Sequence, residues 1–107
     1  MVIVSVSYPA SAGSTFDLDY YREKHMPLVW SRWGALGLRR AELLRGTGAP
    51  GGGAAATHMV ALLTFDSAEA FDRAWREHGR EIMGDIRNFT NAKPAVQFNE
   101  RSEQAGP

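Results

Sequence analysis

Histidine, tyrosine and carboxylate side chains, the groups that can move a proton near neutral pH, gather in two short stretches of the sequence. The first stretch, residues 20–28, reads Tyr-Tyr-Arg-Glu-Lys-His-Met-Pro-Leu. His25 lies in the apolar stripe of a helix predicted here, with Tyr21 one turn earlier on the same side. Pro27 has no N–H for the carbonyl of Glu23, so the helix should kink where His25 projects. An imidazole against apolar walls tends to be neutral, which is the state that a general base needs.

Other interpretations of the histidines stay open. A buried histidine satisfied by a backbone carbonyl, with Tyr21 only packing beside it, is the more frequent arrangement in proteins. His58 begins a predicted strand and His78 ends a predicted helix beside Gly79, so both have local explanations. No two histidines have the close spacing of a metal-binding motif, and no metal site is predicted.

The second stretch, residues 78–91, places a carboxylate beside an apolar stripe. Asp85 flanks the stripe that includes Ile82, where it can orient a histidine or accept a proton. More often such a carboxylate caps a helix, pairs with an arginine such as Arg87, or lies in water. The hypothesis is that Asp85 is the orienting or second acid–base group of a site with His25.

In this hypothesis the reaction is a proton transfer carried out by side chains alone. His25 is the base, and Tyr21 is its hydrogen-bonding partner or a donor to a developing oxyanion. Three tryptophans, Trp30, Trp33 and Trp75, are many for a chain of 107 residues, and they either line an apolar pocket or fill the core.

The composition excludes several classes of function. The 107 residues carry 12 Lys and Arg against 12 Asp and Glu, and the pI is near 6.8. Nucleic-acid binding depends on clustered basic side chains, so no nucleic-acid partner is expected. Without cysteine the chain has no disulfide or thiolate nucleophile, and a cytoplasmic location is expected. No segment approaches the roughly 20 apolar residues of a membrane span, so no membrane partner is expected.

Hydrophobic periodicity predicts the element order βαββαβ. Strands are predicted at residues 2–8, 36–45, 58–65 and 94–99, and helical segments from Asp17 to near Gly34, from Ser67 to Gly79 and over residues 80–89. This order predicts the α+β class: a ferredoxin-like subunit with a four-stranded antiparallel sheet and helices on one face. Residues 1–99 are expected to form one domain, and residues 100–107 a disordered polar tail.

The other face of this predicted sheet needs a cover. The strand at residues 58–65 is apolar at almost every position, which is typical of a strand buried on both faces. An exposed apolar face of that size is unusual on a monomer, and the simplest cover is the same face of a second copy. We therefore expect a homodimer in which two sheets face each other.

Around both stretches the sequence resembles the EthD family of small bacterial proteins. The resemblance rests on residues 16–21 with His25-Met26-Pro27-Leu28, and on His78-Gly79, Glu81-Ile82-Met83, Asp85-Ile86, Asn88 and Thr90. It extends from the first strand through Phe98 and implies a dimeric α+β barrel. The family pattern picks out Tyr21, His25, Asp85, Asn88 and Thr90. Members often have Pro and Tyr where this chain has Arg87 and Phe89, so a tyrosine hydroxyl is absent at that position.

The resemblance implies a pocket between helices and sheet in each subunit. Members are often labelled reductases, and related barrels include cofactor-free monooxygenases, lactone isomerases, dehydratases and cyclases. We expect proton transfer of the isomerase or dehydratase type, or oxidation, on an apolar oxygen-bearing small molecule, with no cofactor. The predicted ligand-binding residues are Trp30, Trp33, His78, Asn88 and Thr90.

Three alternatives remain at this stage. The chain could be a binding or accessory module that holds a hydrophobic metabolite or supports a partner oxidase. It could be a dimeric scaffold in which the tryptophans pack solidly around His25 and leave no cavity. Nicotinamide-dependent reduction is suggested by the family label alone.

Overall fold

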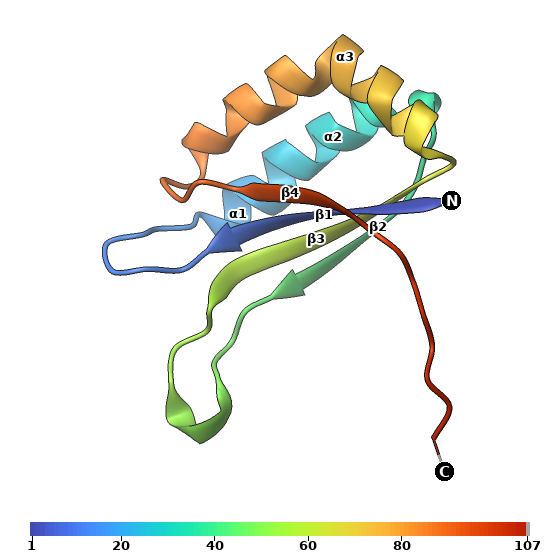
Figure 1. Ribbon diagram of the computed structural model, residues 1–107. Helices are drawn as coiled ribbons and strands as arrows, with labels where there is room; N and C mark the ends of the chain where they lie inside the picture. The colour runs from blue at the N-terminus through green and yellow to red at the C-terminus, as the bar shows by residue number, and fades with distance from the viewer. Residues whose placement is uncertain (107) are drawn as a thin grey trace.

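Four antiparallel strands form one sheet, and the helices lie together on one of its faces (Figure 1). The computed structural model describes residues 1–106. The elements are β1 (Val2–Pro9), α1 (Leu18–Tyr20), the π-helical turn η1 (Tyr21–His25), α2 (Met26–Trp33), β2 (Leu38–Arg45), β3 (Thr57–Phe65), α3 (Ala68–Asp85) and β4 (Ala95–Asn99), with 3-10 turns η2 (Gly34–Leu36), η3 (Pro50–Gly52) and η4 (Ile86–Asn88). The strand order β2-β3-β1-β4 confirms the predicted ferredoxin-like α+β fold.

The two faces of the sheet differ because side chains alternate along each strand. In β3, Met59, Ala61, Leu63 and Phe65 are buried under the helices, while the residues between them are half-buried on the open face. The prediction that this strand is buried on both faces is therefore not met within one chain. The helix-facing side chains form the hydrophobic core, and the pocket described below lies within it.

The first helical segment changes its winding just before Pro27. In η1 the backbone N–H of Met26 donates to the carbonyl of Tyr21, five residues back instead of four. Pro27 then occupies the first turn of α2, which follows η1 without a break, and it offers no N–H to the carbonyls of η1. The expected distortion at His25 is thus present as a π-helical turn, a feature that is frequent at functional sites. Asp17 caps the segment as predicted, since its side chain accepts from the N–H of Tyr20.

The prediction that Gly79 ends the second helix is wrong. After the predicted cap Ser67, α3 continues without interruption through Gly79 to Asp85. A Cβ at position 79 would lie 2.9 Å from the indole of Trp75, so the missing side chain leaves room for that ring. Because the helix continues, His78 lies in its middle and has no helix end beside it.

Residues 100–106 follow β4 without helix or strand, and their side chains are exposed. They belong to the predicted tail, residues 100–107, of which Pro107 lies outside the described residues. Within residues 1–106, no helix combines the length and apolar character that a membrane crossing requires.

Candidate functional site

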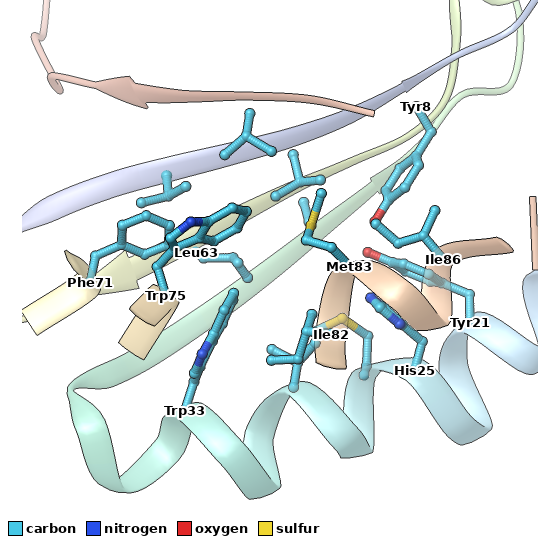
Figure 2. A pocket seen from close by; sticks show the side chains of 16 residues that line it. Tyr8, Tyr21, His25, Trp33, Leu63, Phe71, Trp75, Ile82, Met83 and Ile86 are labelled. Atoms are coloured by element: carbon cyan, nitrogen blue, oxygen red, sulfur yellow. The ribbon is translucent and has the colours of Figure 1, made fainter. Parts of the chain in front are cut away.

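A pocket lies between the helices and the sheet, and side chains from both layers form its walls (Figure 2). Its walls are aliphatic and aromatic, and the side chains with polar atoms are Tyr8, Tyr21, His25 and the two indoles of Trp33 and Trp75. The space open to the centre of a water molecule is about 20 Å³. A site of this volume holds about one water. The pocket is thus nearly filled by its own side chains in this conformation, and a larger ligand requires some of them to move.

At the wall of this pocket, His25 is hydrogen-bonded to Asp85, which is only partly buried and does not line the pocket itself. The Nδ1 atom of His25 lies 2.9 Å from Oδ2 of Asp85, although the two residues are 60 positions apart in the sequence. His25 is 3% exposed. Its ring stacks on Tyr21, with ring centroids 5.6 Å apart, and also contacts Phe89, whose ring centroid is 4.6 Å away. The sequence-based hypothesis that Asp85 orients a histidine therefore has a matching geometry.

The charge states of the pair determine which nitrogen of His25 carries the proton. Burial lowers the pKa of His25 below its usual value, although the hydrogen bond with Asp85 and its charge act in the opposite direction. Partial burial alone would raise the pKa of Asp85, but hydrogen bonds from Tyr20, Asn88 and His25 together hold it below its usual range. An ionised carboxylate only accepts hydrogen bonds, so Nδ1 carries the proton and donates it. The Nε2 atom of the neutral ring then has a free lone pair.

Tyr20 and Asn88 fix the other oxygen of the Asp85 carboxylate. The hydroxyl of Tyr20 donates to Oδ1 over 2.7 Å, and Nδ2 of Asn88 donates to the same oxygen over 2.9 Å. Asn88 was predicted to bind ligand, but here it binds the carboxylate that orients His25. Tyr20 was missed. Its spacing from Asp17 and its position one residue before Tyr21 gave no sign that it would point toward α3.

Tyr21 lies against the ring of His25 without a hydrogen bond to it. The two rings stack, and the Tyr21 side chain is 1% exposed. Tyr8 lies next to it in the pocket and was not predicted as a site residue. The sequence pattern could have indicated Tyr8, since it lies on the same period-two apolar face of β1 as Val4 and Val6.

The remaining predicted ligand-binding residues lie in different places. Trp33 lines the pocket, and its indole N–H donates to the carbonyl of Ala74. Trp30 is 40% exposed and does not line this pocket. His78 is half-buried on α3, outside the lining. Thr90 is buried, and its hydroxyl donates to the carbonyl of Thr15, so it holds the segment before α1 against the segment after α3.

The three histidines do not come together. His58 lies near the start of β3, where its Nε2 is 2.8 Å from Oγ of Ser14 and its ring stacks on Phe16. No cluster of three or more His, Asp or Glu side chains that could hold a metal occurs among the residues that the structure describes.

The buried neutral histidine predicts a pH dependence of stability. Because burial lowers the pKa of His25 in the folded state, the unfolded chain binds more protons than the folded one just below pH 6.5. The free energy of unfolding should therefore fall as the pH drops from about 6.5 toward the folded pKa. Above about pH 6.5, His25 should cause no change in it. Urea unfolding of the wild type and of His25→Gln between pH 5 and 8 measures this. An equal pH slope in both proteins would contradict the prediction.

Three solved structures with this fold are similar to the chain. An EthD-like protein from Ralstonia eutropha shares 36% identity, with 92% of this chain and 89% of that chain covered and a TM-score of 0.85. An ethyl tert-butyl ether D (EthD) family protein from Bacillus halodurans shares 18% identity over 95% of this chain and 100% of that one, with a TM-score of 0.67. A dimeric ferredoxin-like protein from an uncultured marine organism shares 14% identity, covers both chains completely and has a TM-score of 0.61. No protein-family model and no curated protein matches the sequence.

Proposed function

The chain belongs to the EthD-like family, and from this premise we propose that it is an enzyme that transfers a proton within an apolar oxygen-bearing small molecule, without a cofactor. The observation that carries the proposal is the pair formed by His25 and Asp85. It places a neutral imidazole, oriented by an ionised carboxylate, at the wall of a mostly apolar pocket.

The proposed step is the removal of a proton from a carbon next to a carbonyl group. Nε2 of His25 accepts the proton as the C–H bond breaks, and the electron pair moves onto the carbonyl oxygen to give an enolate. Asp85 stabilises the imidazolium that forms, and the hydroxyl of Tyr21 donates to the enolate oxygen. Return of the proton to another carbon gives isomerisation. Loss of a hydroxyl from the neighbouring carbon, taking up the same proton, gives dehydration.

Ligand entry requires flexible side chains to move aside, because the free space is small. Met83 and Trp75 line the pocket from α3, and neither is fully buried. Methionine has an unbranched chain with several rotatable bonds and fills irregular gaps at low cost. We therefore expect rotation of Met83 to enlarge the site.

The function is tested by hydrogen–deuterium exchange on a simple ketone. With 2-tetralone in D₂O, proton NMR measures the rate at which the α-hydrogens are replaced. We expect the protein to raise this rate well above that of buffer at the same pH. If the protein binds the ketone without raising the rate, the proposed enzyme function is wrong and the chain is a binding or accessory module.

We also propose that the chain is a homodimer joined through the open face of its sheet. The face carries apolar side chains from three strands, among them Ile3, Leu44, Val60 and Leu62. Leu44 is 54% exposed in the single chain. The ferredoxin-like protein from the marine organism, which has the same fold, is dimeric.

Leu62→Glu should dissociate this dimer. Leu62 lies opposite Ser5 of β1 and Glu42 of β2, so it is central on the open face. In a two-fold interface one substitution buries two carboxylates, each directly opposite the carboxylate of Glu42, which weakens association by about two orders of magnitude or more. Light scattering after gel filtration at micromolar concentration measures the mass. Arg76→Glu, an exposed change on α3, is the matched control, and a monomeric wild type would refute the dimer.

A further inference from the structure

Two buried phenol hydroxyls in the pocket have no hydrogen-bond partner. Tyr8 is 2% exposed and Tyr21 is 1% exposed, and neither hydroxyl bonds to any group in residues 1–106. The same described residues contain no fully enclosed side-chain nitrogen or oxygen that lacks a partner. The two oxygens must therefore face open space, and both residues line the pocket. A polar group that faces open space in an apolar pocket is free to hydrogen-bond to whatever occupies that space, water or an oxygen atom of a ligand.

The two hydroxyls belong to one end of the pocket, the end of His25. The rings of Tyr8 and Tyr21 meet edge to face with centroids 5.9 Å apart, and Tyr21 stacks on His25. Figure 2 shows these three side chains together, with Trp33, Phe71 and Trp75 at the opposite end. The pocket thus has a polar end and an apolar end.

The charges at the polar end determine what oxygen can bind there. Burial raises the pKa of Tyr8 and of Tyr21, so both phenols are neutral and can donate a hydrogen bond. No lysine or arginine lines the pocket. A carboxylate or phosphate would lose its hydration there without meeting a cation, which is costly. A neutral oxygen that accepts from two phenols meets no such penalty.

We propose that Tyr8 and Tyr21 together form the binding site for a single neutral carbonyl oxygen, and that the substrate is an otherwise apolar ketone or enone. The assignment rests on the proposed function, and it adds Tyr8 to the groups that touch the substrate. The two hydroxyls hold the carbonyl oxygen while the carbon beside it faces Nε2 of His25. The hydrocarbon body of the substrate lies between Trp33 and Trp75.

The test compares three probes with one ring system: 2-naphthol with a neutral oxygen, naphthalene with none, and 2-naphthoate with an anionic group. Equilibrium dialysis gives the affinity of each for the wild type, Tyr8→Phe and Tyr21→Phe. We expect 2-naphthoate to bind at least tenfold more weakly than 2-naphthol. Each Phe variant should lower the ratio of 2-naphthol to naphthalene affinity about five- to tenfold, the effect of one hydrogen bond.

Controls separate this role from a structural one. Trp30→Phe removes an aromatic N–H outside the pocket and should leave the affinity ratio unchanged. The Tyr8 and Tyr21 hydroxyls have no hydrogen-bond partner within residues 1–106, so each Phe variant should melt at the wild-type temperature or above it. A lower melting temperature with an unchanged ratio would overturn the inference, and so would 2-naphthoate binding best.

The inference and the proposed function can fail separately. If the affinity ratios change as expected but 2-tetralone exchange is not accelerated, the carbonyl site stands as a binding site and the catalytic proposal is wrong. If exchange is accelerated and the ratios are the same in all variants, the catalytic proposal stands and the carbonyl site is wrong.

Discussion

His25→Gln should lower the rate of catalysed 2-tetralone exchange by about 100- to 10,000-fold, the range that loss of a general base usually costs. Glutamine has nearly the length of histidine and its amide can still donate to Asp85. Its nitrogen carries no lone pair that accepts a proton near neutral pH, so the basic atom is lost while the shape of the wall is kept. The substitution slows the proton-transfer step itself, so the affinity of His25→Gln for 2-naphthol should change much less than the exchange rate.

The pH dependence identifies the base directly. The wild-type rate should rise with pH as His25 loses its proton and become constant above that point, which lies below 6.5 because burial lowers the pKa of His25. His25→Gln should lack this rise. His58→Gln is the matched control, since His58 is bonded to Ser14 outside the pocket. If His25→Gln exchanges 2-tetralone at the wild-type rate, His25 and Asp85 have no catalytic role.

The order of elements followed from local patterns, whereas Gly79 shows where such patterns fail. The alternation in residues 2–8 and the caps Asp17 and Ser67 depend on neighbours in sequence, and the structure confirms them. A glycine near the end of an apolar stripe usually marks a helix end. At Gly79 the reason for glycine is the Trp75 indole, one turn earlier in the same helix, and its rotamer cannot be read from a periodic pattern.

The site itself was predictable only in part, because its contacts join distant segments. Residue type and burial pattern were enough to select His25, Tyr21 and Asp85 as candidates. The contact between His25 and Asp85 depends on where η1 crosses the end of α3, and no periodicity contains that information. Tyr20 lies outside the apolar stripe of its helix, so its bond to Asp85 could not be anticipated.

Thr90 illustrates how a family pattern can select a residue for structural reasons. Its hydroxyl donates to the carbonyl of Thr15, and its backbone forms an isolated bridge with Phe16. This connection fixes the start of the first helical segment next to the end of α3. Through this connection Thr90 helps to place η1 beside the end of α3, where His25 meets Asp85. Thr90 itself does not line the pocket.

Asp85→Asn should lower the exchange rate by about 100-fold or more, and it tests the carboxylate separately from the imidazole. The neutral amide gives no charge to stabilise the imidazolium, so the pKa of His25 should fall further below its usual value. The amide can also donate to Nδ1, which places the proton on Nε2 and removes the lone pair from the pocket. Both changes oppose proton removal by His25.

NMR titration of the His25 ring gives its pKa and tautomer in Asp85→Asn, alongside the exchange rate. Tyr20→Phe removes one of the two hydrogen bonds to Oδ1 and keeps the charge, so it should reduce the rate by a smaller factor, with the Nδ1–H tautomer retained. Asp72→Asn, an exposed change on the same helix, is the control. An unchanged His25 pKa and tautomer in Asp85→Asn would mean that the carboxylate does not orient the base. Within residues 1–106 Nδ1 has no other hydrogen-bond partner that could take over this role.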